Sequence, residues 1–315
     1  MNKSFILTED CNTITKYIGN EKTVVIPDNI TKIGNGAFKD NTIIESVSMG
    51  DNITSVGMEA FQNCTNLKEI KISNTIQTLN NRVFCGCSSL KNIVLPTSKL
   101  KTIGVGAFSH CTSLINLMIP KSVKTIKRAA FLGCESLENI ILPEKIENID
   151  IYDMFKNCKS LHTINIPEGV TKIIRPSFLG CESLENVIIP NTCEEISFSC
   201  FKDLKQLKNV FINKTYSNLK TINDYAFDGC TSLETIIIPD KITRIYENTF
   251  SNSGIREIYL NNVENISWHA FTDCINLGMI YGPNVTKIVS SSIDENFITK
   301  QNFPKLKRRA CGEMR

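Results

Sequence analysis

Histidine is scarce in this chain, and the three that occur, His110, His162 and His269, are widely separated. A catalytic Ser-His-Asp or Cys-His set needs converging side chains, and this scatter suggests none. Cys-x-x-Cys pairs are absent, with Cys85-Gly-Cys87 the nearest approach, so the usual zinc-ligand spacing is missing. Neither a Walker-type loop nor a G-x-G-x-x-G motif occurs. The sequence therefore predicts a protein that is not an enzyme and that has no cofactor or metal.

Long apolar runs are also missing. No stretch approaches the roughly 18 apolar residues of a membrane span. Near the N-terminus only Phe5–Leu7 is apolar, far short of the roughly 7–15 residues of a signal-peptide core. The net charge of +3 is too small to indicate specific nucleic-acid binding. We therefore expect a cytoplasmic protein whose 13 cysteines are mostly reduced thiols.

One phenylalanine recurs along the chain at steps of 21 to 26 residues, mostly 23. Its copies are Phe38, Phe61, Phe84, Phe108, Phe131, Phe155, Phe178, Phe201, Phe227, Phe250 and Phe271. Three residues after it comes Cys in eight copies, and six residues after it comes Leu or Ile. An apolar-x-apolar segment follows, usually closed by Pro, and then a second short apolar segment of the Val170-Thr-Lys-Ile173 type. The unit reads roughly L-x-x-I-x-I-P-x-x-V-T-x-I-x-x-x-A-F-x-x-C.

This period predicts a repeat solenoid. A unit of about 23 residues cannot bury a core alone, because its two strands are too short to be stable in isolation. Stacked copies bury continuous columns of Leu, Ile and Phe. We expect a mostly β, right-handed curved solenoid of about twelve turns, with one long parallel sheet on its concave face. Residues 1–20 would form an N-terminal cap, 21–290 the solenoid, and 291–315 a C-terminal cap with a basic tail.

The I-x-I-P, V-T-x-I and A-F-x-x-C blocks together resemble the BspA-like, or Treponema-type, leucine-rich repeat. The resemblance covers residues from about 21 to 290. It implies binding rather than catalysis, since members of that family include surface adhesins of bacteria and surface antigens of parasitic protists. The alternative to a cytoplasmic protein-binding scaffold is therefore a cell-surface adhesin or antigen, exported by a non-classical route, that binds host or matrix proteins.

Alternation along the first strand predicts three outward columns of side chains. The first is polar, the third is the Pro column, and the middle column is largely apolar, although Ser48, Lys71 and Asn165 interrupt it. An uncovered apolar stripe indicates an interface. We expect a protein partner of unknown identity to contact Met118, Ile141, Ile188, Phe211, Ile237, Tyr259 and Tyr281. Two alternatives stay open: self-association, or a mere preference of sheets for β-branched residues.

Two further features have more than one interpretation. Cysteines in successive turns could approach disulfide distance, but a small apolar residue also packs well in a buried column, and we favour that structural role. In the tail that begins at Ser291, the segment Ser292–Ile298 predicts a short capping helix before the basic run Lys305–Arg309. That run is typical of a solvated tail, with a nuclear-import signal or a contact with an acidic surface as alternatives.

Overall fold

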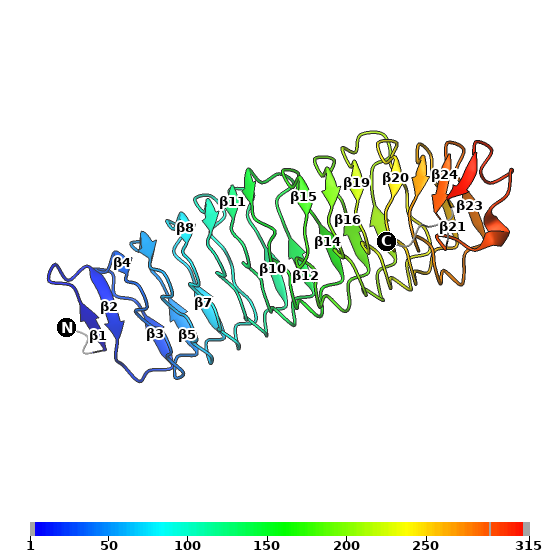
Figure 1. The fold of residues 1–315 in the computed structure, drawn as a ribbon. Coiled ribbons are helices and arrows are strands. Elements are labelled where there is room, and N and C mark those ends of the chain that lie inside the picture. Colours follow the sequence, from blue (N-terminus) through cyan, green and yellow to red (C-terminus); the bar gives the residue numbers. More distant parts are fainter. Residues whose placement is uncertain (1–3, 290, 311–315) are drawn as a thin grey trace. The chain divides into compact units, whose positions relative to one another are not determined.

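The computed structural model describes residues 4–289 and 291–310. They belong to two compact units, an N-terminal unit (Met1–Leu161) and a C-terminal unit (His162–Arg315). Each unit is a β-solenoid in which every turn contributes two short strands (Figure 1). The turns of about 23 residues and the near absence of helix confirm the predicted leucine-rich-repeat solenoid.

The first strand of each turn has its middle residue buried and its outer residues turned outward. In the N-terminal unit these strands are β3 (Thr23–Val25), β5 (Ser46–Ser48), β7 (Glu69–Lys71), β10 (Asn116–Met118) and β12 (Asn139–Ile141). In the C-terminal unit they are β14 (Thr163–Asn165), β16 (Asn186–Ile188), β18 (Asn209–Phe211), β21 (Glu257–Tyr259) and β23 (Met279–Tyr281). We call the outward side of this row the sheet face.

The second strands form a separate row in each unit. In the N-terminal unit they are β4 (Lys32–Ile33), β6 (Ser55–Val56), β8 (Thr78–Leu79), β9 (Thr102–Ile103), β11 (Thr125–Ile126) and β13 (Asn148–Ile149). In the C-terminal unit they are β15 (Lys172–Ile173), β17 (Glu195–Ile196), β19 (Thr221–Ile222), β20 (Arg244–Ile245), β22 (Asn265–Ile266) and β24 (Lys287–Val289).

Neighbouring first strands pair in parallel, as predicted, but they do not make one long sheet. In the N-terminal unit β3, β5 and β7 form a sheet, and the next turn joins it only through an isolated bridge between Lys71 and Val94. In the C-terminal unit the ladder stops after β18, and Thr235 then bridges to Glu257 in β21. The predicted continuous sheet is therefore wrong. Both interruptions lie in turns whose spacing departs from 23 residues, 24 from Phe84 to Phe108 and 26 from Phe201 to Phe227, and the change of length shifts the strand register.

The recurring phenylalanine forms the centre of the core. From Phe38 to Phe155 in the N-terminal unit, successive rings stack with centroids 4.8 to 6.0 Å apart. From Phe178 to Phe271 in the C-terminal unit they lie 5.3 to 5.6 Å apart. All these rings are 2% exposed or less. Each turn therefore buries its largest side chain against an identical neighbour, which is how a unit too small to fold alone becomes stable.

Two positions of each turn have left-handed backbone, which shapes the bend around the phenylalanine. The residue two after Phe has a φ of 53 to 79° throughout, in Asp, Asn, Gly or His. The residue two before Phe also has a positive φ in ten of the eleven turns, and in the remaining turn Pro176 follows a cis peptide bond. Short polar residues and glycine suit this conformation. His110 and His269 occupy such positions (φ 58° and 52°), so backbone geometry accounts for two of the three histidines.

The N-terminal end is covered by an antiparallel hairpin of β1 (Phe5–Leu7) and β2 (Thr13–Tyr17). Tyr17 stacks on Phe38 with centroids 5.1 Å apart, and so continues the phenylalanine column. Its hydroxyl donates to Glu21 Oε2 at 2.5 Å, which gives the buried phenol a polar partner.

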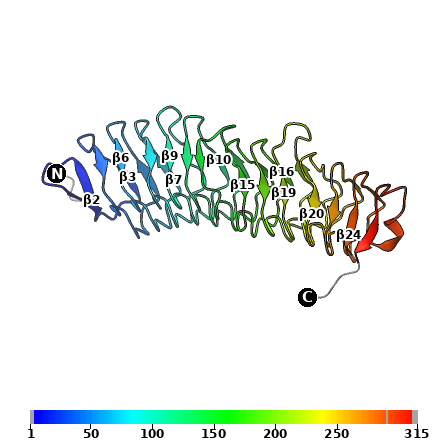
Figure 2. The same cartoon turned by 45° about the horizontal axis from the view of Figure 1, so that its top comes forward.

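The C-terminal end differs from its prediction. The expected capping helix is a single 3₁₀ turn, η1 (Glu295–Phe297), and the buried Phe303 packs beside it. The basic run is not wholly a solvated tail, because Arg308–Ala310 forms β25, which pairs in parallel with β24 (Figure 2). A run of like charges lacks the alternation that identifies a strand, so the sequence concealed it. Residues 311–315 lie outside the described part of the chain.

Candidate partner-binding face

The middle column of the sheet face exposes its apolar side chains in both units. In the N-terminal unit the exposed fractions are 82% for Val94, 65% for Met118 and 60% for Ile141. In the C-terminal unit they are 37% for Ile188, 52% for Phe211, 50% for Ile237, 51% for Tyr259 and 40% for Tyr281. The sequence thus identified the outward orientation of all seven expected contact residues. It missed Val25, 67% exposed at the first position of the same column.

Strand register brings these side chains together in short groups. In the C-terminal unit Ile188 pairs with Phe211, and Tyr259 pairs with Tyr281. The Tyr259 hydroxyl also lies 4.0 Å from the sulfur of Met279, which is itself exposed. Because the ladder is interrupted after β18, the column consists of a group ending at Phe211 and a group formed by the last turns. Both groups present an aromatic ring on a rigid β scaffold.

The polar first column is engaged in hydrogen bonds with itself. In the N-terminal unit Asn139 Nδ2 donates to Asn116 Oδ1 at 3.1 Å. In the C-terminal unit Asn186 Nδ2 donates to Thr163 Oγ1 at 3.2 Å, and Asn209 Nδ2 donates to Asn186 Oδ1 at 2.8 Å. These ladders stiffen the border of the apolar column. The sequence showed the repeated asparagines but not their mutual bonding.

The third column is not an outward one, so that prediction was wrong. Pro96, Pro120, Pro143, Pro167, Pro190 and Pro239 are all buried. The reason is the turn that follows the strand: the carbonyl of Pro120, for example, accepts from the Val123 amide at 3.0 Å. Proline has no amide to donate, so it suits the point where the strand ends and the chain bends inward. The exposed apolar surface is therefore one column wide.

Charged side chains border the beginning of the face in the N-terminal unit. Glu45 accepts from Lys22 Nζ at 2.7 Å and from Lys68 Nζ at 2.6 Å. Hydrogen bonds from these two ammonium groups, Lys22 first, lower the pKa of Glu45 to about 2. The carboxylate is thus ionised and neutralised at neutral pH.

The column of cysteines is buried and hydrogen-bonded. Cys64, Cys87, Cys111, Cys134 and Cys158 in the N-terminal unit, and Cys230 and Cys274 in the other, donate to the carbonyl of the preceding turn's phenylalanine at 3.0 to 3.2 Å. Every cysteine of the described residues is a free thiol. Burial raises the pKa of Cys134 to about 12, so the thiol stays protonated and able to donate. The structural interpretation of the column thus gains a specific role, while the disulfide alternative is wrong for the described residues.

Within residues 4–289 and 291–310, no cluster of three or more His, Cys, Asp or Glu side chains could hold a metal ion. In the same residues, no helix has the length and apolar character needed to cross a membrane.

A known repeat family matches nearly the whole chain. The model of the BspA type leucine-rich repeat region matches residues 12–137, 101–220 and 215–310. No curated protein matches the sequence.

Several solved structures of bacterial proteins resemble it. A leucine-rich repeat protein from Bacteroides ovatus is 23% identical over 96% of this chain and 96% of its own, with a TM-score of 0.57. A leucine-rich cell surface protein from Faecalibacterium prausnitzii is 23% identical over 99% of this chain and 94% of its own, with a TM-score of 0.49. The leucine-rich repeat protein of T. pallidum is 26% identical over 66% of this chain and 90% of its own, with a TM-score of 0.47. Since the family model spans nearly all of the described turns, the chain belongs to the BspA-type leucine-rich-repeat family.

Proposed function

We propose that this chain is a non-enzymatic protein-binding module, and that the sheet face of its C-terminal unit receives a protein partner. The observation that carries the proposal is the exposed apolar column of Ile188, Phe211, Ile237, Tyr259 and Tyr281. In the same strands the intervening residues, such as Val210 and Ile258, are buried to 6% and 1%. The strands therefore present apolar groups on both sides, which a sheet exposed to water does not require.

The kind of side chain supports a protein partner. Tyrosine and phenylalanine supply large contact area with few rotatable bonds, so ordering them on binding costs little entropy. Tyr259 and Tyr281 carry hydroxyls that can bond to a partner's backbone. In the N-terminal unit Met118 and Ile141 continue the pattern with aliphatic groups, and we propose the same kind of contact there.

The experiment is a binding assay in cell extract with the intact chain and a double variant, Phe211→Asp/Tyr259→Asp. Tyr216→Asp is the matched control, because Tyr216 is 73% exposed but lies in the loop after β18 rather than on the sheet face. The proposal requires a protein that the intact chain and the control capture and the double variant does not.

Two other results would refute it. Capture that is equal for all three chains would mean that the sheet face is not the binding site. Concentration-dependent dimers that only the double variant abolishes would mean that the column is covered by a second copy of the chain.

A second candidate function, a surface adhesin or antigen, is supported by the family membership, because BspA-like members include such proteins. It differs from a cytoplasmic scaffold in where the partner is encountered. Biotinylation of intact cells with a reagent that does not cross membranes distinguishes the two. Labelling at the level of a known surface protein supports the adhesin, and labelling only after lysis supports the scaffold.

A further inference from the structure

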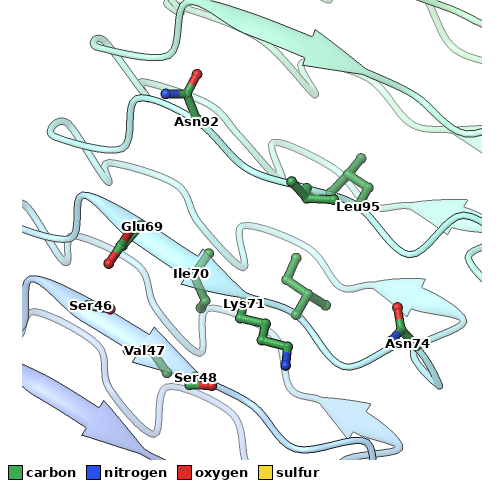
Figure 3. A pocket seen from close by; sticks show the side chains of 11 residues that line it. Ser46, Val47, Ser48, Glu69, Ile70, Lys71, Asn74, Asn92 and Leu95 are labelled. Atoms are coloured by element: carbon green, nitrogen blue, oxygen red, sulfur yellow. The ribbon is translucent and has the colours of Figure 1, made fainter.

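A hollow of about 550 Å³ lies on the sheet face of the N-terminal unit, where the middle column changes character (Figure 3). Ser48 and Lys71 stand at the two positions where later turns carry large aliphatic groups. The hollow also coincides with the interruption of the ladder, since Val94 meets Lys71 only through an isolated bridge. A small side chain, a flexible one and a change of register together leave space that the rest of the face fills.

The bottom of the hollow is aliphatic. Val47, Ile70, Ile72 and Leu95 line it and are 5% exposed or less, while Val94 stands beside them with 82% of its surface exposed. No aromatic ring is among the lining residues, so a sugar ring would have no flat surface on which to stack. A hollow of this composition suits an aliphatic side chain.

Its charges are separated. Figure 3 shows Glu69 and Lys71 at opposite ends of β7, with Ile70 between them. Within the described residues neither Glu69 nor Lys71 takes part in an ion pair, whereas the nearby Glu45 is already held by two lysines. The Lys71 ammonium is therefore a cation available to a ligand, and Glu69 disfavours a ligand that is acidic along its whole length.

We propose that this hollow is a docking site for an extended protein segment that carries an aliphatic residue next to a single Asp or Glu. The aliphatic side chain occupies the space above Ile70 and Ile72. The carboxylate pairs with Lys71 Nζ at the end of the hollow that Ser48 borders. This site is separate from the aromatic column of the C-terminal unit and selects its ligand by charge as well as by apolar contact.

The test is a selection of phage-displayed random heptapeptides on the immobilised full chain, on Lys71→Glu, and on Lys91→Glu as the matched control. Lys91 is exposed in the next turn but does not line the hollow. The intact chain and the control should enrich peptides with Asp or Glu beside Val, Leu or Ile. Lys71→Glu should lose these and enrich Lys or Arg at the same position. A synthetic peptide from the first group should bind Lys71→Glu roughly tenfold more weakly, because the reversal replaces an attraction with a repulsion.

Three outcomes overturn the proposal: no enriched peptide, enrichment that Lys71→Glu leaves unchanged, or binding of sialylated glycans in place of peptides. Circular dichroism of each variant checks folding, and a reversed preference at Lys71→Glu itself requires a folded chain. If peptides depend on Phe211 and not on Lys71, the C-terminal face binds and this hollow does not. The two proposals can therefore fail separately.

Discussion

Replacing Phe131 with alanine should destabilise the N-terminal unit by about 3–5 kcal/mol. The ring is fully buried and stacks on Phe108 and Phe155 with centroids 6.0 and 5.7 Å away. Alanine removes the ring's transfer free energy and leaves a cavity between two turns that cannot close, because the backbone ladders on either side fix their spacing. Urea denaturation followed by circular dichroism measures the loss.

The matched control is Phe211→Ala, which removes the same ring from the sheet face, where it is 52% exposed. It should cost about 1 kcal/mol or less. Phe131→Leu refines the comparison, since it keeps most of the buried volume and should cost less than about 1.5 kcal/mol. Equal losses for the two alanine variants would refute the conclusion that stacked rings inside the turns, rather than rings in general, hold the solenoid together.

Three further predictions concern the backbone, the thiols and the charges. Ala129 has a φ of 56° and Ala130 is buried, so Ala129→Gly should raise stability by about 1 kcal/mol and Ala130→Gly should lower it by about 0.5–1 kcal/mol; changes of the same sign in thermal denaturation would contradict this. Cys11 is exposed and should react with a thiol reagent in the native chain, whereas Cys134, whose pKa burial raises to about 12, should react only after unfolding; peptide mapping by mass spectrometry that finds both labelled at once would argue against the buried column. The pKa of Glu45 is lowered to about 2, so its contribution to stability is present above its ordinary pKa and lost as the pH falls through 2; the difference between the intact chain and Glu45→Gln should therefore close in that range, and a constant difference would exclude the ion pairs as its source.

The repeat allowed most of the fold to be predicted from sequence. Phe131 and its counterparts recur with one spacing, and the alternation of Ile70 and Ile72 assigned the inward side of the strand, which their burial confirms. A periodic sequence determines a periodic structure because every turn meets the same neighbours.

What the sequence could not predict lies where the period breaks or where atomic distances decide. The interruption beside Val94 follows from one additional residue, whose effect on register depends on how the loop absorbs it. The left-handed backbone at His110 could have been inferred from the Asp, Asn and Gly at equivalent positions, since these residues share a tolerance of positive φ. The thiol hydrogen bonds could not, because cysteine in a buried column packs well with or without a carbonyl in reach.

Within the candidate site, the outward direction of Tyr259 followed from alternation, but the burial of the prolines did not. Alternation applies only while the strand lasts, and at Pro120 the chain has already begun to turn. The hollow beside Lys71 was visible in the sequence only as an interruption of the apolar column. Its depth depends on side chains from three turns, which no single repeat describes.

The thiol and asparagine ladders share a direction. Cys134 donates back to Phe108, Cys158 back to Phe131, and Asn209 back to Asn186, so each donor belongs to the later turn and each acceptor to the earlier one. A ribosome makes the earlier turn first. Every newly synthesised turn therefore meets acceptors that are already in place, and the order of synthesis is also the order in which these bonds can form. Folding during translation could then proceed turn by turn without waiting for the end of the chain.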